Sequence, residues 1–189
     1  PFSVVAKPTG AACNLDCQYC FFLSKELLYD QKRQSMSEET LETYVKNFLL
    51  ASLDGEVTML WQGGEPTLRG LPFFEHLIEL CEKYRRPTQE VRHAIQTNGT
   101  LITEQWARFF KDNDVLVGIS IDGPKDLHDA YRLNRGGHGT HSMVIRGWEH
   151  LRNADVDTNI LCTVHAANED HGLEVYRYFR DELGAQYMQ

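Results

Sequence analysis

The sequence predicts an α/β fold in which helices cover a sheet of parallel strands. Two observations indicate this fold. Short apolar runs alternate with amphipathic segments along the whole chain, and a polar or glycine-containing turn follows each apolar run. Such alternation is typical of βα units joined by crossover helices. The pattern alone allows either a sheet that curls into a barrel or an open, doubly wound sheet.

The predicted strands are short and rich in apolar or β-branched residues, as buried parallel strands usually are. They cover residues 2–7, 57–62, 91–97, 115–121 and 157–164, and a sixth strand begins at residues 187–189. This assignment puts Cys162 inside the fifth strand.

Helices connect these strands. The first is expected to begin near Ser37, Pro72 suits the first turn of the second, and Thr103 has the hydroxyl of an N-cap for the third. A glycine-rich loop at residues 136–139 precedes the fourth helix. The predicted apolar faces are Leu41, Val45, Phe48 and Leu49; Phe74, Leu77, Ile78 and Cys81; Trp106, Phe109 and Phe110; Val144, Trp148 and Leu151; and Leu173, Tyr176 and Phe179. Cys81 therefore belongs to the predicted core.

Composition narrows the class of protein. The 189 residues are 42% hydrophobic and 24% charged, as expected of one soluble globular domain. A net charge of -8 argues against binding to nucleic acid or to an anionic membrane. The apolar runs are too short to cross a bilayer and the first residues do not resemble a signal peptide, so we expect a cytoplasmic protein. Because the chain starts at Pro1 and stops at Gln189 where a strand begins, we expect a piece of a longer protein.

Three cysteines, Cys13, Cys17 and Cys20, lie within eight residues, and no fourth cysteine is near them in the sequence. Iron-sulfur clusters normally take four thiolates, so three predict a four-iron cluster with one iron free to bind another molecule. Zinc is the alternative metal, but zinc ribbons need a second ligand pair that is missing here. Unliganded thiols are the third alternative. Five cysteines in all do not match a secreted disulfide framework.

Turn motifs also end the other predicted strands, and in a parallel α/β sheet these positions share the edge where active sites form. Gly63-Gly64-Glu65-Pro66 would let a ligand approach the backbone, with its amides binding a carboxylate and Glu65 an ammonium group. The alternative is a plain turn ended by Pro66. Ser120, at the end of the fourth strand, could bind a ribose hydroxyl or merely pack there.

Five further polar or aromatic side chains lie near these turns. Arg132 and Arg135 could pair with a ligand carboxylate, although most loop arginines are only solvated. Tyr19, between two cysteines, is placed to contact an adenine base. Asn98 is expected to shape a turn, and His165 is expected to be an exposed residue at a strand end rather than a base.

Together the motifs resemble those of the radical S-adenosylmethionine (radical SAM) enzymes. They are a CxxxCxxC loop after the first strand, a Gly-Gly-Glu-Pro turn after the second and a Ser-Ile-Asp-Gly segment after the fourth. Residues 7–15, 60–66 and 96–100 resemble more closely the anaerobic sulfatase-maturating enzymes. The resemblance covers nearly the whole chain. It implies a partial (β/α)6 barrel of the TIM type, truncated at about the sixth strand, with residues 1–189 forming one incomplete radical SAM core domain.

The resemblance also implies cofactors and partners. Cys13, Cys17 and Cys20 would bind three irons of a four-iron, four-sulfur (4Fe-4S) cluster, and the fourth iron would chelate S-adenosylmethionine. Reductive cleavage of this cosubstrate would give a 5'-deoxyadenosyl radical, which in the maturating enzymes takes a hydrogen atom from the β-carbon of a cysteine or serine of a sulfatase. Oxidation and hydrolysis then leave formylglycine. The implied partners are that sulfatase and a low-potential electron donor such as a flavodoxin or ferredoxin. The residues implied to contact or support the cosubstrate are Tyr19, Gln62, Gly64, Glu65, Ser120 and Arg132.

In the resembling enzymes a cysteine-rich domain with two auxiliary clusters follows the core domain and carries an acidic proton acceptor. We expect both beyond Gln189, so no catalytic residue is assigned within the chain, and the chain alone is not expected to complete peptide oxidation. Cys81 and Cys162 lie inside predicted elements and do not replace the auxiliary ligands. Two other functions stay open: a different peptide-modifying maturase, for example one that forms thioethers, and an iron-sulfur electron carrier, which needs no pocket where turns converge.

Overall fold

The computed structural model describes residues 3–21 and 35–189. Their centre is a sheet of five parallel strands whose order in space follows their order in the sequence. The strands are β1 (Val5–Ala6), β2 (Gly55–Trp61), β3 (Gln89–Thr97), β4 (Val115–Ser120) and β5 (Thr158–Leu161). A doubly wound sheet reverses its strand order at a switch point, whereas a barrel does not. The predicted parallel α/β fold of partial-barrel type is therefore confirmed.

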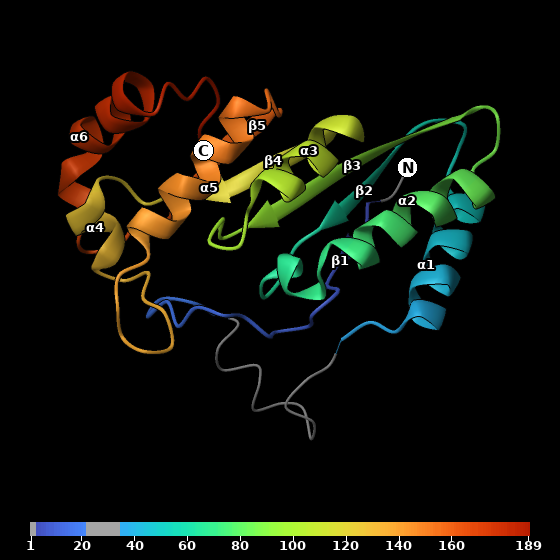
Figure 1. The fold of residues 1–189 in the computed structure, drawn as a ribbon, viewed down its shortest axis with the longest axis horizontal. Coiled ribbons are helices and arrows are strands. Elements are labelled where there is room, and N and C mark those ends of the chain that lie inside the picture. Colours follow the sequence, from blue (N-terminus) through green and yellow to red (C-terminus); the bar gives the residue numbers. More distant parts are fainter. Residues whose placement is uncertain (1–2, 22–34) are drawn as a thin grey trace.

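Each described helix lies between consecutive strands or after β5 (Figure 1). The helices are α1 (Glu38–Ala51), α2 (Leu71–Tyr84), α3 (Glu104–Asp112), α4 (Lys125–Asp129), α5 (His141–Asn153) and α6 (Gly172–Arg177). The hydroxyl of Ser37 accepts a hydrogen bond from the Thr40 amide at the start of α1, and Thr103 does the same for the Trp106 amide at the start of α3. Both starts confirm the sequence prediction, because these hydroxyls satisfy amides that have no partner inside the helix.

The strands bury one face under the helices. On β2, Val57, Met59 and Trp61 are buried, whereas Thr58 between them is exposed. Alternation of this kind means that only one face of the sheet is covered. The opposite side, on which Thr58 and Gln96 lie, is called the open face below.

A single hydrophobic core fills the space between the covered face and the helices. Leu41 of α1, Leu77 of α2 and Leu151 of α5 are almost inaccessible to solvent. Burying a leucine side chain contributes about 1.5–3 kcal/mol, so these predicted faces hold the helices on the sheet. Cys81 is also 1% exposed, which confirms its place in the core. Among the described residues, no helix is both long and apolar enough to span a membrane.

Two predictions near the C-terminus are wrong. Cys162 is not inside a strand, because β5 already ends at Leu161. The predicted apolar face of the last helix is shifted: Leu173 and Tyr176 are 62% and 44% exposed, whereas Val175 is buried. After Arg177 the chain continues in a wider π turn at Tyr178–Glu182, which breaks the regular helical spacing on which the prediction depended.

The last residues lie along the edge of β5. Met188 forms a parallel bridge with Ile160, the Gln189 amide donates to the Ile160 carbonyl at 2.9 Å, and the Cys162 amide donates to the Gln189 carbonyl at 2.8 Å. These bonds confirm that a sixth strand position begins at residues 187–189.

The cysteine-bearing segment and the loop after α4 run side by side along one edge of the sheet, in blue and orange in Figure 1. Leu15 and Asn134 form an antiparallel bridge, and the Gln18 amide donates to the Tyr131 carbonyl at 3.1 Å. The strand ends point toward this edge, because the parallel strands all run in the same direction. The fold therefore brings two loops, more than 100 residues apart in the sequence, to the candidate site.

Candidate functional site

The Gly-Gly-Glu-Pro turn after β2 packs directly on the segment that leads into the cysteine loop. The Glu65 amide donates to the Ala12 carbonyl at 2.8 Å, and the Thr9 hydroxyl donates to the Gly63 carbonyl at 3.3 Å. Gly64 has a φ of +54°, and a Cβ atom there would lie 2.1 Å from the Ala12 oxygen. Only glycine fits this close approach, so the turn fixes where the cysteine loop starts.

Glu65 itself is fully buried at the centre of this edge. Its carboxylate accepts hydrogen bonds from the Thr67 amide and hydroxyl, the Thr97 hydroxyl and the Asn98 amide, at 2.6–3.0 Å. Burial raises the pKa of this carboxyl, and the hydrogen bonds offset part of that rise. The sequence suggested that Glu65 accepts from an ammonium group. In the structure protein N–H and O–H groups donate to both of its oxygens, so Glu65 joins the turn after β2 to the turn after β3.

The turn after β3 reaches the first cysteine. Asn98 accepts from the Thr100 amide at 3.0 Å, as expected of a residue that shapes a turn, and its side-chain nitrogen donates to Asn14 at 2.9 Å. The same nitrogen lies 3.6 Å from the Cys13 sulfur, and the Leu15 amide lies 3.4 Å from it. Cys13 thus sits among N–H donors, which stabilise a thiolate.

Cys13, Cys17 and Cys20 are free thiols, and all three are buried or half-buried. Burial raises the pKa of Cys13 and of Cys17 to about 11, and neighbouring thiols add to this rise. The positive charge of Arg132 acts on Cys17 in the opposite direction. Within residues 3–21 and 35–189, no three His, Cys, Asp or Glu side chains are arranged to hold a single metal ion. The thiol set provides ligands of the type that an iron-sulfur cluster takes, with N–H donors and a cation nearby.

Asp122, after β4, is the centre of a second hydrogen-bonded group. Its side chain is fully buried and accepts from Arg132 twice, Nε to Oδ2 at 2.8 Å and Nη2 to Oδ1 at 3.1 Å. The Tyr19 hydroxyl also donates to Oδ2, and the Thr163 amide donates to Oδ1 at 2.9 Å. Burial alone would raise the pKa of Asp122, but the charge and hydrogen bonds of Arg132 outweigh it and lower the pKa. An ionised carboxylate therefore links the cysteine loop, β4, the loop after α4 and the end of β5.

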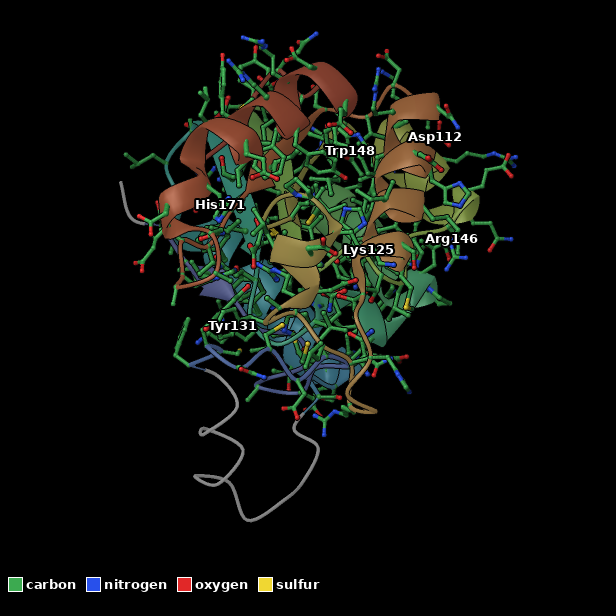
Figure 2. All side chains as sticks on the ribbon, turned by 90° about the vertical axis from the view of Figure 1, so that its left-hand side faces the viewer. Asp112, Lys125, Tyr131, Arg146, Trp148 and His171 are labelled. Carbon is green, nitrogen blue, oxygen red and sulfur yellow. The ribbon has the colours of Figure 1, made fainter. Side chains whose placement is uncertain are left out.

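His165 belongs to the same group, which corrects the expectation that it is an exposed residue. Its side chain is only 6% exposed, and its Nε2 atom lies 3.5 Å from Asp122 Oδ2. The ring stacks on Tyr19 with centroids 5.4 Å apart and lies 4.5 Å from the ring of Tyr131. Figure 2 shows Tyr131 beside the blue N-terminal segment. The sequence did not reveal this burial, because it depends on residues from three separate loops.

The remaining predicted site residues lie at the same edge, but in different settings. Ser120 is half-buried at the end of β4, and its hydroxyl accepts from the Gln96 amide group at 3.0 Å. Gln62 is half-buried just after β2. Arg132 and Tyr19 meet at Asp122, and the Arg132 guanidinium lies 5.5 Å from the centre of the Tyr19 ring. Arg135 donates to the Cys13 carbonyl at 2.9 Å, so it supports the cysteine loop.

Sequence reasoning missed Asp122 as a member of the site. The available signal was an acidic residue directly after a buried strand, followed ten residues later by Arg132. It also missed Gln96, the hydrogen-bond partner of Ser120, because a glutamine in a strand is usually read as a surface residue.

A family model described as the radical SAM superfamily matches residues 8–179. The chain belongs to the radical SAM superfamily. Enzymes of this superfamily use a 4Fe-4S cluster and S-adenosylmethionine. The buried and half-buried thiols, the N–H donors around Cys13 and the partly accessible Gly64 in the glycine turn fit these two groups in chemical type.

Radical SAM proteins of one type are especially similar to this chain. The serine-type anaerobic sulfatase-maturating enzyme of Bacteroides thetaiotaomicron is 38% identical over 190 residues, covering 100% of this chain and 45% of that protein. The cysteine-type enzyme of Clostridium perfringens is 42% identical over 183 residues, covering 96% and 49%. A solved structure described as native anSMEcpe with bound AdoMet and Cp18Cys peptide superposes with a TM-score of 0.90 and 40% identity, covering 98% of this chain and 49% of that one. The chain spans about half the length of these relatives.

Proposed function

We propose that the chain is the S-adenosylmethionine-cleaving domain of an enzyme that oxidises a cysteine or serine of a sulfatase to formylglycine. One observation carries the proposal: three free thiols of one loop are anchored at the strand-end edge by the turns after β2, β3 and β4. The similarity to both serine-type and cysteine-type sulfatase-maturating enzymes supports the substrate class. It does not favour one residue type over the other.

In this proposal Cys13, Cys17 and Cys20 are the cluster ligands. A bound, reduced 4Fe-4S cluster with S-adenosylmethionine supplies the one-electron cleavage that gives a 5'-deoxyadenosyl radical. Two features of the chain favour the ionised form of buried cluster thiols. Asn98 and the Leu15 amide donate toward the Cys13 sulfur, and the Arg132 charge favours ionised Cys17. Because burial raises the thiol pKa values, cluster binding must release these protons, and loading should improve with rising pH.

The proposed cosubstrate contacts divide into two kinds. Ser120, Gln62 and the Gly64 backbone are partly accessible at the strand-end edge and would bind polar groups of S-adenosylmethionine directly. Tyr19 and Arg132 bind Asp122 through their side chains, so they would act by fixing the cysteine loop. Glu65, with every oxygen engaged, would support the site rather than touch the cosubstrate.

The partners and the wider protein are also proposals. We infer a sulfatase as peptide substrate, a flavodoxin or ferredoxin as electron donor, and a cytoplasmic location. An auxiliary-cluster region with the acidic proton acceptor would follow Gln189. The supporting observation is that the similar proteins are about twice as long as the matched region.

The test uses the complete protein, purified and reconstituted with iron and sulfide without oxygen. We expect reductant and S-adenosylmethionine to give 5'-deoxyadenosine, measured by liquid chromatography, and a cysteine-type or serine-type sulfatase peptide to gain formylglycine, measured by mass spectrometry. Unchanged peptides would reject sulfatase maturation, and a thioether product would support the alternative maturase.

Single cysteine variants test the ligand assignment. Replacing Cys13, Cys17 or Cys20 with alanine should abolish cluster assembly, because each removes one of three thiolates from the same loop. Cys81→Ala is the matched control, since Cys81 lies on the buried face of α2 in the core. Equal iron retention in all four variants would contradict the assignment.

A further inference from the structure

Four residues lie in direct register across the open face of the sheet. Gln96 of β3 pairs with Gly118 of β4, and Gly118 pairs with Asn159 of β5. Gln62 directly follows the last registered pair of β2 and β3, which places it beside Gln96. We call Gln62, Gln96, Gly118 and Asn159 the amide row. Three of its members carry a side-chain carboxamide, and all three are half-buried.

The row is shaped around the missing side chain of Gly118. A Cβ atom at Gly118 would lie 2.1 Å from Oε1 of Gln96 and 3.1 Å from Oδ1 of Asn159. Two amide oxygens from different strands thus converge on one point above the glycine. The Gln96 nitrogen donates to Ser120, which fixes the direction of its oxygen. Because the Gln96 oxygen already occupies the place of a Cβ atom at Gly118, a ligand N–H group would donate to the two oxygens from above that point.

Part of this hydrogen-bonding capacity is unused. Within the described residues, the side-chain amides of Gln62 and Asn159 have no hydrogen-bond partner. Neither amide is among the fully buried atoms that lack a partner, so both remain accessible to water or to a ligand. Asn159 also lines a hollow of about 620 Å³, together with Leu116 and Gln189. A ligand can therefore reach this end of the row.

The chemistry of the row favours a neutral peptide group. A carboxamide offers both donors and an acceptor, which match the C=O and N–H of a main-chain amide. The row contains no charged side chain, and the next open-face positions toward the strand starts on β2, β3 and β4 are Leu60, Ala94 and Leu116. Just before β5 the next such position is Asp157, and Asp155 and Arg152 line the same hollow as Asn159, so charged groups lie near that end of the row.

The row starts at Gln62, itself a proposed cosubstrate contact, and extends from there across the sheet to Asn159. Ser120 and Gly64 lie nearer the strand-end edge, where the cysteine loop packs, whereas the row crosses β4 below Ser120. A cosubstrate bound to a cluster at the edge would thus lie between the cluster and the row. A reacting residue on the side of the cosubstrate away from the cluster would then face the row.

We propose that the amide row binds the main chain of the peptide substrate, with the Gln96 and Asn159 oxygens over Gly118 accepting a peptide N–H. This inference rests on the proposed function, because it assumes a peptide substrate. It names side chains of this chain that hold the peptide next to its reacting residue.

The first test is Asn159→Leu in the complete, reconstituted enzyme with S-adenosylmethionine and no reductant. The probe is a cysteine-type sulfatase peptide, and calorimetry measures its Kd. We expect the peptide Kd to rise about tenfold, the effect of losing roughly one hydrogen bond. The Kd of S-adenosylmethionine and the iron content should stay at parent values. Gln186→Leu is the matched control, because Gln186 is exposed and lines the same hollow outside the row.

A second measurement uses the parent enzyme, so it does not depend on the folding of a variant. Peptides methylated at one main-chain nitrogen at a time are titrated into the parent enzyme, and methylation at one position near the reacting residue should raise the Kd about tenfold. The same methylation should have little further effect on Asn159→Leu, because both changes remove the same bond.

Three results would overturn the inference. A parent-like peptide Kd in Asn159→Leu, with no position sensitive to methylation, would show that the row does not hold the peptide. A raised Kd for S-adenosylmethionine alone would assign the row to the cosubstrate. In both cases cosubstrate cleavage and peptide oxidation by the parent would leave the proposed function standing. A parent that cleaves the cosubstrate but binds neither the cysteine-type nor the serine-type peptide would reject both.

Discussion

Replacing Asp122 with asparagine should destabilise the protein by about 3–5 kcal/mol, the usual cost of removing one partner from a buried ion pair. The Asp122 side chain is 0% exposed and that of Arg132 is 9% exposed, so the guanidinium would keep its charge without a counter-charge or water. Asparagine has nearly the same shape as aspartate but only one acceptor oxygen. It cannot serve Arg132, the Tyr19 hydroxyl and the Thr163 amide together.

Urea unfolding of the complete protein under anaerobic conditions measures this loss. Asp181→Asn is a matched control, because Arg180 also donates to Asp181 through Nε and Nη2, at 2.6 and 2.8 Å, but the pair is about half exposed. Water screens an exposed ion pair, so the control should lose far less stability than Asp122→Asn. If Asp122→Asn and Asp181→Asn lose equal stability, burial is not what makes the Asp122 pair important.

Three further changes test other parts of the structure. Glu65→Ala should cost about 3 kcal/mol of unfolding free energy, because it leaves four buried donor contacts without an acceptor, and a loss below 1 kcal/mol would contradict this. Gly64→Ala should lower the iron content after reconstitution, since its Cβ would displace the cysteine segment, whereas Gly172→Ala, with open space around it, should not. Burial lowers the folded-state pKa of His93 to about 4, below the ordinary 6.5, so the folded state binds fewer protons and stability should fall as pH drops from about 6.5 to 4. In His93→Leu that pH dependence, about 3 kcal/mol, should disappear from anaerobic unfolding curves, and an unchanged slope would refute its assignment to His93.

The fold could be predicted where short-range patterns decide it. Ser37 and Thr103 mark helix starts because each hydroxyl bonds an amide three residues away. The last helix could not be predicted as well. Its buried face depends on the π turn at Tyr178–Glu182. The Ala185 amide then donates to the Phe179 carbonyl, a contact that forms only when the chain returns to β5. The short helix α4 after β4 was also not anticipated.

The location of the site could be predicted, because the C-terminal ends of parallel strands lie at one edge of the sheet. The cysteines and the glycine turn were recognised by residue type and spacing. The role of Asp122 was not, because its partner Tyr19 lies 103 residues away and a lone aspartate after a strand is usually a turn residue. Buried polar partnerships of this kind depend on distances in space, which spacing along the chain does not give. The same reason explains the wrong expectation for His165.

Electron paramagnetic resonance tests most directly whether the three-cysteine loop leaves one iron free for the cosubstrate. The complete protein is reconstituted and reduced without oxygen, and spectra are recorded before and after adding S-adenosylmethionine. We predict the signal of a reduced four-iron cluster that changes when the cosubstrate is added and is absent from Cys17→Ala. A spectrum that the cosubstrate leaves unchanged, or a cluster that survives the loss of Cys17, would contradict it.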